Sequence, residues 1–101
     1  MSESAVRMSE SGELMLSGVL DYRTGPDLRK HGQALIKSST ANALVVDCSA
    51  VVKSSSVGLS LLLCFMRDAQ AAGKALSIRA MPEDMREIAQ VSELTELLAH
   101  P

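Results

Sequence analysis

The chain has 101 residues, of which 47% are hydrophobic and 22% charged, and this predicts one globular domain, residues 1–101, with a single modest core. Aromatic residues make up only 2% and the net charge is −2, which argues against base-stacking nucleic-acid surfaces and against a basic footprint for DNA, RNA or anionic membranes. The longest apolar stretch, residues 57–66, is too short to cross a bilayer, so we expect no direct membrane insertion.

The N-terminal region predicts a β-hairpin followed by a helix. Residues 5–8 and 13–17 flank a Ser11-Gly12 turn, so we expect two antiparallel strands, with residues 18–21 leading out of the second one. The motif Thr24-Gly25-Pro26 predicts a helix start, with Thr24 or Gly25 as the N-cap and proline in the first turn. Helical spacing then gives one apolar stripe, followed by a polar loop; the stripe is Leu28, Gly32, Leu35 and Ile36, and the loop is residues 38–42.

The central region predicts a buried strand and a buried helix. Residues 43–47 are apolar on both sides, as expected for a central strand that is covered on both faces. A second apolar run predicts a helix over residues 56–72 that ends at Gly73. Asp47 falls at the end of the predicted strand, where α/β folds place functional residues, but its carboxylate could equally bond nearby loop amides.

The C-terminal region predicts a strand over residues 76–79, a helix that begins at Pro82 and a short last helix containing Leu94, Leu97 and Leu98. The complete order is therefore β-β-α-β-α-β-α-α. This order predicts an α/β fold with a four-stranded, mostly parallel sheet, an antiparallel edge hairpin and about four helices.

Charge is uneven along the chain. The first predicted helix region is basic, whereas the segment after Pro82 is acidic; the basic residues are Arg23, Arg29, Lys30 and Lys37, and the acidic ones are Glu83, Asp84, Glu87, Glu93 and Glu96. Each face either meets a protein partner or is simply solvated, which keeps a small domain soluble.

Motifs for catalysis, nucleotide binding and metal binding are missing from the sequence. It contains no G-x-S-x-G elbow, no phosphate-binding glycine loop and no His, Cys or carboxylate cluster at ligand spacing. His31 and His100 are isolated, so we expect neither an enzyme, a metal nor a cofactor. Cys48 and Cys64 lie inside apolar runs, as core residues of a reduced cytoplasmic protein do, and the polar residues 1–11 do not resemble a signal peptide.

Three consecutive hydroxyls precede the central helix, in the run Lys53-Ser54-Ser55-Ser56. A helix N-terminus exposes unpaired backbone N–H groups and carries partial positive charge. Ser56 is expected to cap this helix, which contributes about 1 kcal/mol, and it could also belong to a docking and regulatory surface. Lys53 is either solvated or reaches a partner carboxylate. Gly58 permits close backbone approach, which would serve internal packing or partner contact.

Around this serine segment the chain resembles the STAS domain family. The segments Asp47-Cys48-Ser49-Ala50-Val51 and Ser55-Ser56-Val57-Gly58-Leu59 look like the family signature, in which a strand ending in Asp-Leu-Ser is followed by Asp-Ser-Ser-Gly-Leu at a helix start. The earlier Leu16-Ser17-Gly18-Val19-Leu20-Asp21 is similar to the family's Leu-x-Gly-x-Leu-Asp, and residues 82–98 fit its last two helices.

The pattern is closer to one branch, the small cytoplasmic STAS subunit of Mla-type ABC transporters. That branch has Asp-Thr-Gly-Gly-Leu-Ala-Leu-Leu-Leu, which residues 55–63 match without a gap, with Ser56 on the branch's functional threonine. The resemblance implies a non-catalytic cytoplasmic protein that binds the transporter's ATPase, and through it the permease, in a complex that maintains outer-membrane lipid asymmetry. The implied partner-binding residues are Lys53, Ser54, Ser55, Ser56, Val57 and Gly58.

The resemblance also leaves an alternative, because the family includes anti-sigma-factor antagonists. In those proteins a partner kinase phosphorylates the serine directly before the Gly-Leu pair. Here that position is Val57, which has no hydroxyl, and the family's aspartate falls on Ser55. Both departures count against the usual phosphorylation switch, although phosphorylation of the neighbouring Ser56 would restore one.

Overall fold

The computed structural model describes residues 4–91. They form seven elements, in the order strand, strand, helix, strand, helix, strand, helix. These are β1 (Ala5–Met8), β2 (Leu14–Leu20), α1 (Gly25–Ser38), β3 (Ala43–Ser54), α2 (Ser56–Ala71), β4 (Ala75–Arg79) and α3 (Glu83–Val91).

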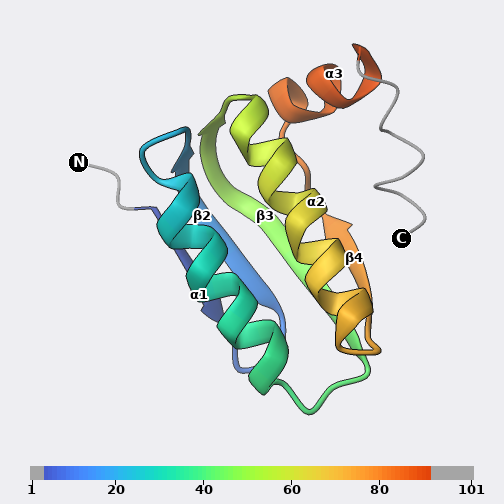
Figure 1. Cartoon of the computed structure of the whole chain (residues 1–101). Helices are drawn as coiled ribbons and strands as arrows, with labels where there is room; N and C mark the ends of the chain where they lie inside the picture. Colours follow the sequence, from blue (N-terminus) through green and yellow to red (C-terminus); the bar gives the residue numbers. More distant parts are fainter. Residues whose placement is uncertain (1–3, 92–101) are drawn as a thin grey trace.

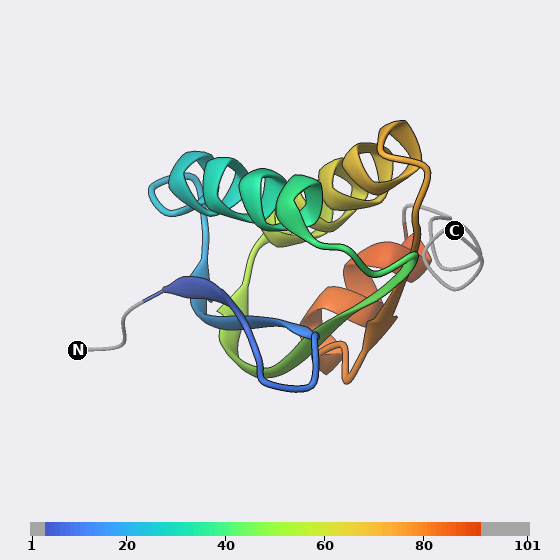
Figure 2. The ribbon, with the colours of Figure 1, turned by 90° about the horizontal axis from the view of Figure 1, so that it is seen from below.

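The four strands form one sheet in the order β1-β2-β3-β4. Strand β1 pairs antiparallel with β2, whereas β2, β3 and β4 run parallel to one another. Helices α1 and α2 lie side by side on one face of the sheet, and α3 lies at one end, in contact with α2 and β3 (Figures 1 and 2). The predicted fold class, a mostly parallel sheet with an antiparallel edge hairpin, is confirmed.

The core lies between the sheet and the pair of helices. Along β2 buried and half-buried residues alternate, because successive side chains of a strand point to opposite faces. Phe65 of α2 is fully buried at 0% exposure. It contacts α1 at Gly32, where a built Cβ would lie 2.3 Å from the Phe65 ring, so a side chain at position 32 would push the two helices apart.

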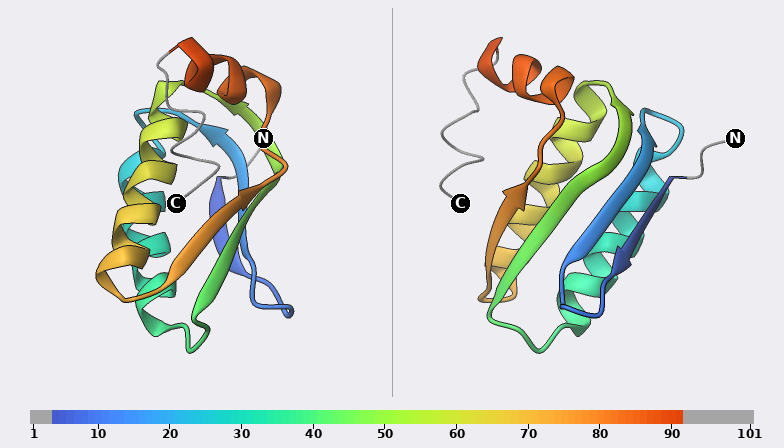
Figure 3. Two further views of the ribbon diagram at one scale, coloured as in Figure 1. Left: turned by 90° about the vertical axis from the view of Figure 1, so that its right-hand side faces the viewer. Right: turned by 180° about the vertical axis from the view of Figure 1, so that it is seen from behind.

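The two central strands are longer than the sequence predicts. Strand β2 continues to Leu20 and β3 continues to Ser54, because the extensions pair with each other at Val19–Lys53 and Leu20–Ser54. This backbone pairing does not depend on hydrophobic alternation. The prediction that β3 is covered on both faces is also wrong for the described residues. Helices α1 and α2 share one face of the sheet, and no helix stands in front of the strands in the view from behind (Figure 3, right). Val45 of β3 is accordingly only half-buried.

The C-terminal prediction is confirmed as far as the described residues reach. Helix α3 begins at Glu83, directly after Pro82, and buries Met85 and Ala89 of its apolar stripe. The last helix expected around Leu94, Leu97 and Leu98 lies outside the described residues. Within residues 4–91, none of the helices combines the length and the hydropathy that a membrane span needs.

Candidate functional site

The candidate site lies at the edge of the sheet where the parallel strands end. The connections that follow β2, β3 and β4 all leave from this edge, which is next to α3 in Figure 1. In open α/β sheets this is the edge where ligands and partners usually bind, because the loops and the helix N-termini converge there. The predicted serine segment, between β3 and α2, is one of these connections.

Ser54 is an internal structural residue of this connection. It is the last residue of β3 and is only 7% exposed. Its backbone N–H donates to Asp84 Oδ2 of α3 at 3.1 Å, and its hydroxyl donates to the Ser55 carbonyl at 2.8 Å. Its backbone N–H thus links the end of β3 to α3, and its hydroxyl is used within the connection to α2.

Ser55, and not Ser56, is the N-cap of α2. Its backbone is extended, and its hydroxyl accepts a hydrogen bond from the Val57 N–H at 3.2 Å. The same hydroxyl donates to the Leu20 carbonyl at 3.3 Å, and the Ser55 N–H donates to that carbonyl at 3.0 Å. The end of β2 thus fixes the start of α2, which moves the cap one residue before the expected position.

Ser56 and Lys53 remain on the surface. Ser56 is the first residue of α2 and is exposed, and the structure shows no hydrogen bond from its hydroxyl to any of residues 4–91. Lys53 is exposed at the end of β3, with no ion pair to a described carboxylate. These two side chains, with the exposed Ser55, are the accessible part of the predicted site.

Val57 and Gly58 face inward to different degrees. Gly58 is buried, and a Cβ built there would lie 2.0 Å from Ser54 Oγ and 3.1 Å from Leu20 Cδ1. Of the two roles left open for Gly58, the geometry selects internal packing. Val57 is half-buried, and its Cγ1 would lie 2.9 Å from a Cβ at Gly25, so α1 and α2 approach closely at their N-terminal ends.

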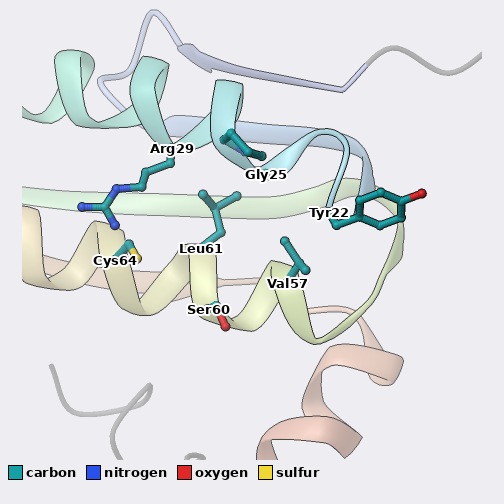
Figure 4. A pocket seen from close by; sticks show the side chains of 8 residues that line it. Tyr22, Gly25, Arg29, Val57, Ser60, Leu61 and Cys64 are labelled. Atoms are coloured by element: carbon teal, nitrogen blue, oxygen red, sulfur yellow. The ribbon is translucent and has the colours of Figure 1, made fainter.

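A groove between α1 and α2 opens beside this surface (Figure 4). Its volume is about 430 Å³, and its walls are mainly apolar. The lining residues are Tyr22, Gly25, Pro26, Arg29, Val57, Ser60, Leu61 and Cys64. Only Val57 of this set was predicted as a site residue. The others are spread over two helices and a loop, and their proximity follows from the helix pairing, which no local motif signals.

Asp47 does not belong to this site. It lies within β3, opposite Met15 and Arg79, and not at the strand's end as the sequence suggested. Arg79 donates to its Oδ2 at 2.7 Å and the Ser49 N–H donates to its Oδ1 at 2.8 Å. The Arg79 hydrogen bond, followed by those from Ser49, lowers the pKa of Asp47 from 3.8 to about 2. Asp47 thus has a structural role in joining β3 to β4.

The described histidine and cysteines that the sequence singles out are spread over α1, β3 and α2. No group of three or more His, Cys, Asp or Glu that could hold a metal ion occurs in residues 4–91. His31 is exposed on α1, and His100 lies outside the described residues. Both cysteines are free; Cys48 is buried in the core, where desolvation raises the pKa of its thiol to about 12, and Cys64 is half-buried in the groove.

Comparisons with known proteins agree with this fold. The sequence profile of one family, described as "Mlab, STAS domain", matches residues 4–99. A chain of the Acinetobacter MlaFEDB complex in an ATP-bound conformation is similar, with 26% identity, a TM-score of 0.80 and coverage of 95% of this chain and 98% of that one. A comparison with curated protein sequences gives no match.

Two anti-sigma-factor antagonists share the fold at lower identity. One, from Mycobacterium paratuberculosis, is 24% identical with a TM-score of 0.76, and the alignment covers 100% of this chain and 86% of that one. The other, SpoIIAA in its unphosphorylated form, is 17% identical with a TM-score of 0.70, and the alignment covers 95% of this chain and 84% of that one. At these identities the likeness shows the fold alone.

Proposed function

The chain belongs to the STAS domain family, and we propose that within this family it is a non-catalytic accessory subunit of an ABC transporter that binds and regulates the ATPase. The proposed complex lies at the inner membrane, and this subunit binds it from the cytoplasmic side. The complex maintains outer-membrane lipid asymmetry. The likeness to a chain of MlaFEDB over 95% of this chain supports the assignment to a transporter.

The observation that carries the proposal is the exposed surface at the start of α2, formed by Lys53, Ser55 and Ser56. The neighbouring residues Ser54 and Gly58 are fully engaged inside the domain. Ser56 by contrast has an exposed hydroxyl at a helix N-terminus, where backbone N–H groups favour an acceptor from a partner. We therefore restrict the proposed contact surface to the exposed residues of the predicted set, with the half-buried Val57 at its margin.

The proposed mechanism is a population shift without chemistry in this chain. Docking of the α2 start on the ATPase contributes binding free energy only in the conformation that the surface fits. The ATPase population then moves toward that assembled or active conformation, by at most the difference in affinity between the states.

The test is a pull-down from native membranes with tagged wild-type protein and Ser56→Glu, read by mass spectrometry. We expect an ABC ATPase and its permease with the wild type, and loss of both with the charged variant. Because Ser55 provides the cap, Ser56→Ala removes only the contact, and Ser77→Glu, at an exposed position of β4, controls for added charge. Equal recovery with Ser56→Glu and Ser77→Glu would refute docking through this residue.

The exposed hydroxyl of Ser56 also favours a second candidate function, a phospho-regulated anti-sigma-factor antagonist. A phosphate at the first position of α2 would be stabilised by the helix N-terminus. Val57, which occupies the usual phosphorylation position, counts against this function. Recovery of a kinase-like anti-sigma factor in the same pull-down, without a transporter subunit, would select it.

A further inference from the structure

The groove between α1 and α2 has the composition of a protein-binding site. Its floor is apolar, with Leu61 only 4% exposed, and Tyr22 and Arg29 lie at its two ends (Figure 4). Tyr22 is 76% exposed. Protein interfaces have an apolar buried centre, and tyrosine and arginine are enriched among the residues that carry their binding energy.

The groove is continuous with the surface proposed to bind the ATPase. Val57 lines the groove and directly follows Ser56. The volume of about 430 Å³ lies near the lower end of small binding sites, which span about 300–1,000 Å³. It therefore has room for a few side chains of a partner segment. The walls are held in place because Gly25 lets α1 approach Val57 closely.

The charges near the groove favour an acidic partner. Arg23, in the loop before α1, has a side chain that is 74% exposed, and the Arg29 side chain is 41% exposed. The nearby carboxylates Asp21 and Asp68 are held within the fold, whereas Asp27 on α1 is exposed. Asp21 accepts hydrogen bonds from the Arg23 and Thr24 N–H groups and lies 3.5 Å from the Arg23 guanidinium. The Asp68 side chain is only 9% exposed beside Arg29, and its Oδ2 has no hydrogen-bond partner in residues 4–91.

Arg29 retains hydrogen-bonding capacity for such a partner. The distance from its Nη2 to Asp68 Oδ1 is 3.6 Å, beyond a good hydrogen bond. Arginine presents five N–H donors in a planar fork that matches a carboxylate. An incoming carboxylate thus finds donors that make no hydrogen bond within residues 4–91, beside the carboxylate of Asp68.

We propose that this groove binds a segment of the ATPase that places an apolar side chain over Leu61 and Val57 and a carboxylate against Arg29. The chemistry of the segment follows from the groove, whereas its identity as part of the ATPase rests on the proposed function. Ser56 and the groove then form one continuous interface, with a polar contact at the helix start and an apolar anchor beside it.

The two native cysteines provide the test without any substitution. Cys64 lies in the groove and Cys48 is buried in the core. Iodoacetamide labelling, followed by mass spectrometry, is compared between the isolated protein and the complex purified through it. We expect Cys64 to react in the isolated protein and to be protected about tenfold or more in the complex, whereas Cys48 stays unmodified in both.

Two matched pairs of variants test the contact itself. Ser60→Trp fills the groove from an exposed position, and Gln70→Trp adds the same bulk to an exposed position of α2 outside it. Arg29→Glu reverses the rim charge, and Arg67→Glu does so on α2 outside the groove. We expect the groove variants to lose ATPase capture about tenfold or more and the controls to retain it, with melting curves showing that all four are folded.

The possible failures are distinguishable. If the ATPase is captured but Cys64 reacts as fast in the complex as in the isolated protein, the groove is empty and the inference is refuted, while the proposed function stands. If the complex contains no ATPase, the proposed function is refuted and the partner assigned to the groove falls with it. Equal capture by Arg29→Glu and Arg67→Glu would refute the acidic character of the segment.

Discussion

Gly58→Ala should destabilise the domain, although alanine is normally the better helix residue. A Cβ at this position would lie 2.0 Å from the buried Ser54 Oγ and 3.1 Å from Leu20 Cδ1. Overpacking of this kind typically costs about 1–3 kcal/mol. Displacing the Ser54 hydroxyl also breaks its hydrogen bond to the Ser55 carbonyl, at a further cost of about 1 kcal/mol.

The helix-propensity gain of about 1 kcal/mol offsets part of this cost, so we expect a net loss of about 1–3 kcal/mol in the free energy of unfolding. Urea denaturation followed by circular dichroism measures it, and each kcal/mol corresponds to about 4–8 °C in melting temperature. Ser60→Ala, at an exposed position of α2, reports the smaller propensity gain of alanine over serine without the clash.

A double-mutant cycle isolates the clash. Ser54→Ala removes the Oγ that the new Cβ meets, so Gly58→Ala should be close to neutral in that background, giving a coupling energy of at least about 1 kcal/mol. Two outcomes would refute the contact with Ser54 as the reason for glycine at this position. In one, Gly58→Ala is neutral or stabilising in the wild-type background; in the other, it costs the same free energy of unfolding in the wild-type and Ser54→Ala backgrounds.

Three further predictions concern the cap, a carboxylate and the backbone. Ser55→Ala should lower the free energy of unfolding by about 1 kcal/mol and Ser56→Ala by less than about 0.5 kcal/mol, as measured in urea; the reverse order would contradict the cap assignment. The folded-state pKa of Asp47 is lowered, so its contribution to the free energy of unfolding is complete above its ordinary pKa of 3.8 and disappears as the pH falls toward about 2. In acid titrations followed by circular dichroism, Arg79→Met should weaken this pH dependence, while the part due to the Ser49 hydrogen bonds remains; an unchanged profile would show that Arg79 does not contribute to it. Ala80 has a φ of 59°, so Ala80→Gly should raise the free energy of unfolding by about 0.5–1 kcal/mol, and a lower thermal midpoint would contradict the strain.

The order of the elements could be predicted from the sequence because local chemistry determines it. The Ser11-Gly12 turn, the Gly25-Pro26 helix start and the helix stop at Gly73 all act through backbone preferences within a few residues. The family resemblance likewise depends on short segments around residues 16–21 and 47–59. These signals sufficed for the α/β class and the mostly parallel sheet, and they led to the candidate site proposed at the start of α2.

The details of the site could not be predicted, because they depend on contacts between distant segments. The cap is Ser55 because its hydroxyl and N–H reach the Leu20 carbonyl, 35 residues earlier, and three adjacent serines offer no local way to choose among them. Ser54 is internal because Asp84 of α3 accepts its N–H.

The sequence by itself thus determined which segments become helices and strands, because hydrophobic spacing and turn residues act locally. The tertiary structure alone decided which of the three hydroxyls stays free, where Asp47 lies relative to Arg79, and that a groove lies between α1 and α2. Each of these depends on how far one element extends along another. The extent to which two elements overlap is set by packing of the whole core, such as Phe65 against Gly32, and not by the residues of the site.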